Sequence, residues 1–180
     1  MVAALVAGGC FWGAGTTVGA GRAGLLLLAA ALVQIRLLCN LFDGMVAIEA
    51  GRASPDGAFW NEFPDRISDM LIVLGIAAGV GEPALGWSAT AFAFLTAYVR
   101  ELGINCGAGA DFSGPMAKQH RMALITFAAI LSIAEPLWSG TGQILVSALW
   151  VIIIGAAITA LRRSLKIVTV LRRKAKIQTP

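Results

Sequence analysis

Residues 24–43 read GLLLLAAALVQIRLLCNLFD, an apolar run that ends in an asparagine and an aspartate. About 20 mostly apolar residues are enough for an α-helix to cross the hydrocarbon core of a membrane. The whole chain has the same character, because 58% of its 180 residues are hydrophobic and 13% are charged. A soluble domain usually carries about 25% charged residues. The composition therefore predicts an integral membrane protein.

Six stretches of the chain, taken with their flanking residues, approach the length of a membrane span. Glycine and alanine are frequent in them, which favours close contact between helices in lipid. The pattern predicts an all-α polytopic membrane bundle of six transmembrane helices that forms a single domain over residues 1–180. The first stretch lacks the basic start of a signal peptide, so we interpret it as the first span, with Met1 at its start or inside it. The six stretches are residues 2–19, 24–46, 67–80, 84–99, 122–138 and 144–161.

Basic residues are unevenly distributed between these stretches. They occur around residues 47–66 and 100–121 and in the C-terminal tail, but not near Glu82 or Glu135. Basic connections stay in the cytoplasm, which predicts a multi-pass protein of the inner cell membrane with both termini cytoplasmic. Arg22 is the exception to this pattern. Anchoring at anionic lipid headgroups explains the basic tail, so nucleic acid is not expected as a partner.

The acidic residues are concentrated in one part of the chain. Six of the ten fall within residues 43–69, at the ends of two neighbouring predicted spans. Ionisable side chains at membrane depth are costly and usually mark a functional site. Residues spaced by three or four lie on one face of a helix, and such spacing occurs on both spans. One face carries Arg36, Asn40, Asp43 and Ala47, and the other carries Asn61, Asp65 and Asp69.

Packing of these two faces against each other would bring together Asn40, Asp43, Asn61 and Asp65 as oxygen ligands. Oxygen ligands without nitrogen or sulfur suit Mg²⁺ or Mn²⁺. Such an ion is the usual device for handling a pyrophosphate. Pro64 would either start the second helix or kink it.

The stretch from Asn40 to Asp65 resembles the signature of the CDP-alcohol phosphatidyltransferases, which reads D-x2-D-G-x2-A-R-x8-G-x3-D-x3-D. All its spacings are kept, and five of its eight fixed positions match. The departures are Asn40 and Asn61 in place of two acids, and Ile48 in place of the arginine. The matching residues are Asp43, Gly44, Ala47, Gly57 and Asp65, and Ser54 falls where members of the family can place a small hydroxyl.

The resemblance implies a metal-dependent enzyme of phospholipid biosynthesis. It would transfer a phosphatidyl-type group from a CDP-activated lipid to the hydroxyl of a polar acceptor and release CMP. The family also implies a homodimer in the lipid bilayer, with the active site facing the cytoplasm. Asp65 is implied as the general base. The implied ligands of one or two Mg²⁺ or Mn²⁺ ions are Asn40, Asp43, Asn61 and Asp65, and the implied CDP-binding residues are Gly44, Ala47, Ser54 and Gly57.

Other charged residues are candidates for binding phosphate or the acceptor. Arg36 or Arg52 could replace the missing arginine of the motif. Asp69 is interpreted either as a ligand or as a surface partner of Arg66, and Glu62 as a solvated loop charge. The full set of candidates is Arg36, Arg52, Asp69, Arg100, Lys118 and Arg121.

Two other functions are consistent with the same residues. A catalytically silent relative that binds lipid or a membrane partner is favoured by Asn40, Asn61 and Ile48. A small carrier is less favoured, because carriers often have repeated halves and helices broken at mid-span, and neither is seen here. The sequence does not identify the acceptor alcohol.

Overall fold

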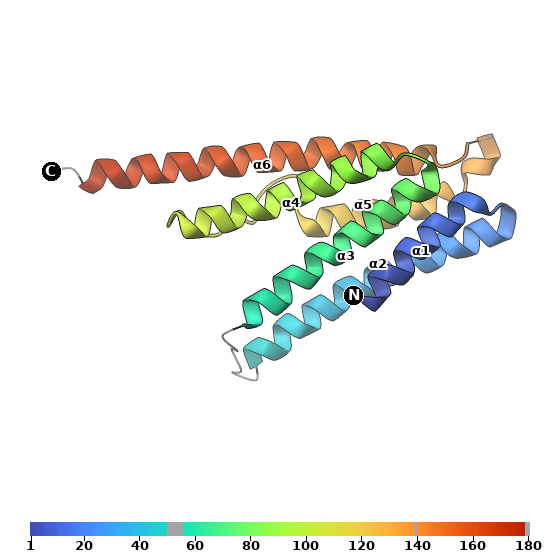
Figure 1. Cartoon of the computed structure of the whole chain (residues 1–180), viewed down its shortest axis with the longest axis horizontal. Helices are drawn as coiled ribbons and strands as arrows, with labels where there is room; N and C mark the ends of the chain where they lie inside the picture. Colours follow the sequence, from blue (N-terminus) through green and yellow to red (C-terminus); the bar gives the residue numbers. More distant parts are fainter. Residues whose placement is uncertain (50–55, 139, 179–180) are drawn as a thin grey trace.

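The computed structural model describes residues 1–49, 56–138 and 140–178, without the side chains of residues 43–49, 58, 61, 177 and 178. Within these ranges the chain forms six α-helices and one 3-10 helix and has no strand (Figure 1). The prediction of an all-α fold is confirmed. The elements are α1 (Val2–Thr16), α2 (Gly19–Glu49), α3 (Gly57–Val80), α4 (Pro83–Asn105), α5 (Lys118–Ser132), η1 (Glu135–Trp138) and α6 (Gln143–Gln178).

Two helices of the described ranges are long and apolar enough to cross a membrane. They cover Gly19–Phe42 in α2 and Gln143–Lys176 in α6. The apolar helix Val2–Thr16 is shorter. α3 carries several charged residues near its start, and α5 has only 15 residues. Six helices therefore correspond to the six predicted stretches, while six membrane spans remain a prediction.

α1 packs against both α2 and α3 (Figure 1), and its contact with α3 is made by the backbones. A Cβ atom on Gly8 would lie 2.5 Å from the carbonyl oxygen of Leu71, and one on Gly15 would lie 1.9 Å from that of Gly79. A Cβ atom on Gly75 would lie 2.3 Å from the carbonyl oxygen of Gly8. Only glycine permits this approach, which is the small-residue packing expected of helices in lipid.

The ends of α3 follow from local sequence. Gly81 ends the helix with a positive φ of 77°, and Pro83 begins α4 at its first turn, which are the positions where glycine and proline favour the end and the start of a helix. At the other end, α3 begins at Gly57 and continues through Pro64. The interpretation of Pro64 as the start of the helix is therefore wrong. Asp56, which precedes the helix, accepts a hydrogen bond from the Trp60 indole at 3.0 Å and supports this earlier start.

An ion pair joins α2 to the connection between α5 and α6. Arg22 lies 2.6 Å from Glu135 and donates to the carbonyl oxygen of Ser132 at 2.8 Å. Glu135 is fully buried and also accepts the N–H groups of Gly142 and Ile144, at 2.7 and 2.6 Å. Buried charges must be paired and hydrogen-bonded. Arg22, the exception in the charge pattern, thus has a structural partner.

We expect Gly75→Leu to destabilise the fold, because its side chain would push α1 away from α3. Overpacking of this kind costs about 1–3 kcal/mol, so the thermal unfolding midpoint in detergent should fall by several degrees. Gly9→Ala is the matched control on α1, because nothing lies within 4 Å of a Cβ atom at that position. Equal midpoints for the two variants would contradict this account of the α1–α3 contact.

Candidate active site

Arg36 joins the predicted faces of α2 and α3. Its side chain is 3% exposed. Nη2 donates to the carbonyl oxygen of Asp65 at 2.9 Å and to carboxylate Oδ1 of the same residue at 3.0 Å. Nη1 lies 2.7 Å from Oδ1 of Asp69. One guanidinium therefore holds two carboxylates on successive turns of α3, an arrangement that its planar fork of donors permits.

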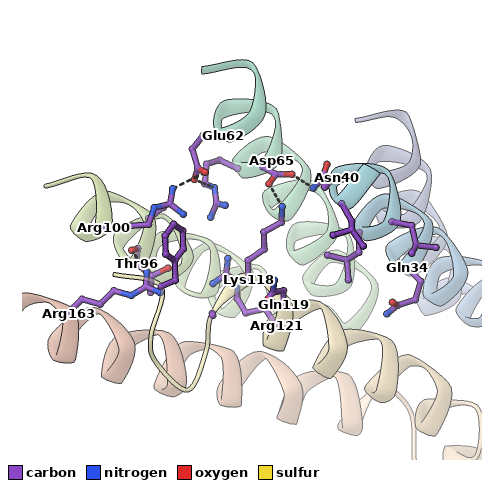
Figure 2. Close-up of a pocket in the computed structure, with 17 residues that line it drawn as sticks. Gln34, Asn40, Glu62, Asp65, Thr96, Arg100, Lys118, Gln119, Arg121 and Arg163 are labelled. Atoms are coloured by element: carbon purple, nitrogen blue, oxygen red, sulfur yellow. Dashed lines mark hydrogen bonds and ion pairs between the residues drawn. The ribbon is translucent and has the colours of Figure 1, made fainter. Parts of the chain in front are cut away.

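Asp65, on α3, accepts from three side chains that belong to two other helices, α2 and α5. Asn40 on α2 donates through Nδ2 to Oδ1, where Arg36 also donates, and Lys118 at the start of α5 forms an ion pair with Oδ2 (Figure 2). The expected proximity of Asn40 and Asp65 is confirmed. An ionised carboxylate offers about four acceptor positions, and three of those on Asp65 are in use.

Asp69 follows Asp65 by one turn of α3 and is 2% exposed. Its Oδ2 accepts a hydrogen bond from Nη2 of Arg121 at 2.9 Å, whereas Nη1 of Arg66 is 4.0 Å away. Asp69 does pair with Arg66, at this longer distance, but it is buried, so only its interpretation as a surface residue is wrong. Arg121 is itself 1% exposed, and its Nη1 donates to the carbonyl oxygen of Met116 at 3.1 Å. Both terminal nitrogens of the Arg121 guanidinium therefore have partners within the protein.

A cavity of about 620 Å³ opens beside Asp65. Helices α2, α3, α4, α5 and α6 and the connection between α4 and α5 all contribute to its walls. Asp65 and Lys118 lie on one side of it, and Arg100 and Arg163 lie on the other (Figure 2). The polar residues that line it are Gln34, Asn40, Glu62, Asp65, Arg66, Thr96, Arg100, Lys118, Gln119, Arg121 and Arg163.

Arg163, which belongs to the basic C-terminal tail of the sequence, lies on α6 and lines the cavity. Its side chain is buried, with Nε donating to the carbonyl oxygen of Ser113 at 3.0 Å and Nη1 to that of Thr96 at 2.8 Å. It forms no ion pair with any described residue. An unpaired guanidinium at the wall of a cavity is suited to bind an anion. No sequence signal separates Arg163 from the neighbouring basic residues, since only the packing of α6 against α4 buries it.

Arg100 approaches the cavity from α4. Its Nη2 lies 2.8 Å from Oε2 of Glu62 and 2.8 Å from Oε1 of Glu101, and its guanidinium carbon lies 5.2 Å from the ring centroid of Phe112. Glu62 also pairs with Arg66, at 3.0 Å. Glu62 is thus part of α3 and of a partly buried ion-pair network, which corrects its interpretation as a solvated loop charge.

The connection between α4 and α5 brings Phe112 to the cavity and the carbonyl oxygen of Ser113 to Arg163. Burial alone would raise the pKa of Asp111. The N–H of Ser113, at 3.0 Å, and the ammonium of Lys166, at 3.1 Å, outweigh it and hold that pKa below its usual range. The charged carboxylate therefore fixes the loop that supplies Ser113 to Arg163.

The other predicted site residues are described only in part or lie outside the described residues. Gly57 is the first residue of α3. Asp43, Gly44 and Ala47 lie on α2, and Asn61 lies on α3, but their side chains are outside the described residues. Arg52 and Ser54 lie outside the described residues altogether. The metal and CDP contacts assigned to these residues stay predictions.

The described donors do not fit two divalent ions. Asp65 has one acceptor position left, and both oxygens of Asp69 contact guanidinium groups. Among the described residues no group of three or more His, Cys, Asp or Glu could hold a metal ion. A divalent ion of this kind needs several oxygen ligands at once. The site is instead rich in cationic side chains.

Three curated proteins are similar to the chain, although no protein-family model matches it. A bifunctional IPC transferase and DIPP synthase from Rubrobacter xylanophilus is 40% identical over 88 residues, or 46% of this chain and 20% of the relative. A phosphatidylinositol phosphate synthase from Streptomyces avermitilis is 26% identical over 156 residues, or 81% and 62%. An archaetidylinositol phosphate synthase from Methanothermobacter thermautotrophicus is 35% identical over 91 residues, or 48% and 47%.

These relatives are CDP-alcohol phosphatidyltransferases, so the resemblance that the motif indicated is confirmed. The chain spans 20%, 62% and 47% of the lengths of these three relatives, in the order given above.

We expect Asp69→Asn to destabilise the protein strongly, because it leaves Arg36 and Arg121 without their shared carboxylate. Breaking a buried ion pair on one side costs about 3–5 kcal/mol, which should appear as a large fall in the unfolding midpoint. Glu101→Gln is the control, since the side chain of Glu101 is 48% exposed and its pair with Arg100 lies near the surface. A midpoint for Asp69→Asn as high as that of the control would contradict the structural role of Asp69.

Proposed function

We propose that this chain transfers a phosphatidyl-type group from a CDP-activated lipid to the hydroxyl of a polar acceptor and releases CMP. One observation carries the proposal: Asp65, the last acid of the motif, faces the same cavity as the unpaired guanidinium of Arg163. A base and an anion-binding group on opposite walls suit an acceptor that bears both a hydroxyl and a phosphate. The similarity to CDP-alcohol phosphatidyltransferases supports the same activity.

The charge of the cavity supports a phosphorylated acceptor. Five cationic and two acidic side chains line it, and a cavity with an excess of positive charge concentrates anions. Guanidinium groups form strong, directional hydrogen bonds with phosphate oxygens. Two of the relatives are named as synthases of inositol phosphate lipids. We therefore infer that the acceptor is a phosphorylated polyol such as inositol phosphate, with Arg163 and Arg100 at its phosphate.

The reaction follows from the position of Asp65. Its Oδ2 accepts one hydrogen bond, from Lys118, and so keeps an acceptor position for the hydroxyl of the acceptor alcohol. Asp65 takes the proton as the alcohol oxygen attacks the phosphorus that carries the lipid. The bond between that phosphorus and the bridging oxygen breaks, and CMP leaves with the electron pair. Arg36 and Asn40 hold the carboxylate in place during this step.

The remaining features of the proposal rest on the sequence. Basic connections favour a site at the cytoplasmic face of the inner membrane, and the family resemblance suggests a homodimer of six-span subunits and a requirement for Mg²⁺ or Mn²⁺. The second candidate function is a silent relative that binds the CDP-lipid, which Asn40, Asn61 and Ile48 favour.

Release of CMP from CDP-diacylglycerol is the direct test. We expect purified protein with inositol phosphate and Mg²⁺ or Mn²⁺ to release CMP, and Asp65→Asn to slow release by about 10²-fold or more, as the loss of a general base does. Glu101→Gln should keep the wild-type rate. Failure to release CMP with any phosphorylated or free alcohol, with the CDP-lipid still bound, would leave the silent relative as the function.

Selectivity for a phosphorylated acceptor tests the role of Arg163. We expect Arg163→Gln to raise KM for inositol phosphate by roughly tenfold, because one charge-assisted contact to the phosphate is lost. Arg162→Gln is the matched control on the neighbouring, exposed residue. Steady-state kinetics with inositol phosphate and with inositol separate the two effects. An unchanged preference between the two acceptors in Arg163→Gln would contradict the assignment.

A further inference from the structure

The site combines the loss of motif acids with a cation that contacts Asp65. Asn40 and Asn61 stand at sequence positions where the motif has carboxylates. The ammonium of Lys118, whose side chain is 22% exposed, forms an ion pair with Asp65, to which Asn40 also donates (Figure 2). Lys118 comes from the start of α5 and crosses to α3 to make this contact. A cation beside Asp65 complements the loss of negative charge at Asn40.

Charge balance disfavours a second divalent ion. The described carboxylates of Asp65 and Asp69 contact the cations of Arg36, Lys118 and Arg121, and Arg66 lies 4.0 Å from Asp69. The diphosphate of a CDP-lipid adds two negative charges, which one divalent ion offsets. A second divalent ion would add positive charge that these two carboxylates do not offset in a partly buried site, which is strongly unfavourable.

The contact between Lys118 and Asp65 also opposes the binding of a second ion at this carboxylate. Its ammonium contacts Oδ2 of Asp65, the oxygen of that carboxylate to which neither Arg36 nor Asn40 donates. A divalent cation bound to the same oxygen would lie a few ångströms from the ammonium, and like charges at that separation repel strongly in a medium of low dielectric. The ammonium therefore competes with a metal ion for Asp65.

We propose that the ammonium of Lys118 takes the place of a second divalent cation beside Asp65, so that the chain binds one divalent ion, the lower of the two numbers that the motif implies. The proposal rests on the proposed function, because it assumes that the site receives the diphosphate of a CDP-lipid. It makes Lys118 a permanent part of the charge compensation that the family motif assigns to metal. It also accounts for the replacement of two acids by asparagine at unchanged spacing.

Equilibrium dialysis with Mn²⁺ tests this proposal. The purified chain in nanodiscs of zwitterionic lipid is dialysed against Mn²⁺ with CDP at equal concentration on both sides, and the excess Mn²⁺ per chain is counted by elemental analysis. We expect one Mn²⁺ per wild-type chain and, in Lys118→Met, a second ion or binding that is at least roughly tenfold tighter, since a competing charge is removed. Lys118→Arg should match the wild type.

Two further variants make the result decisive. Lys118→Gln keeps a donor for Asp65 without the charge, should behave as Lys118→Met does, and replaces it if the methionine variant does not fold. Lys166→Met removes an exposed lysine that pairs with Asp111 and should leave Mn²⁺ binding unchanged. Two ions or none on the wild-type chain, or unchanged or weaker binding in the neutral Lys118 variants, would overturn the proposal. The number of Mn²⁺ ions bound per chain is measured without an acceptor and without turnover. This proposal can therefore fail while CMP release succeeds, and it can hold while CMP release fails.

Discussion

The guanidinium of Arg36, buried between two carboxylates of α3, is the interaction on which the rest of the site depends. A buried charge is tolerated only when it is paired and hydrogen-bonded. Arg36 meets this condition by contacting Asp65 and Asp69 together, and Asp69 in turn holds Arg121 of α5. The faces of three helices are thereby fixed relative to one another. With that register set, Asp65 faces the cavity.

Much of this arrangement could be predicted from the sequence. The spacing of Arg36 and Asn40 on one helix, and of Asp65 and Asp69 on the next, correctly indicated that these residues meet, because helical periodicity fixes which side chains share a face. The start of α3 was less predictable. Charged residues interrupt its apolar pattern, and the helix begins at Gly57, ten residues before the apolar stretch.

The far wall of the cavity could not be predicted. Arg163 resembles every other basic residue of the C-terminal tail until α6 packs against α4, and the reach of Lys118 to Asp65 depends on a long side chain that crosses between helices. Helical spacing shows which side chains share one face of a helix, but it does not show which helices pack against each other. The departure of the motif at Asn40 gains meaning only from these contacts, because Asn40 and Lys118 both contact the carboxylate of Asp65.

The central claim is that Arg36 and Asp69 act as one buried unit that organises the site. A double-mutant cycle with Arg36→Met and Asp69→Asn, measured as the free energy of unfolding by SDS in mixed micelles, tests it most directly. Each single change leaves a buried charge without its partner, so the double variant should lose less stability than the sum of the two, with a coupling energy of at least about 1 kcal/mol. Losses that add within about 0.5 kcal/mol would contradict the claim.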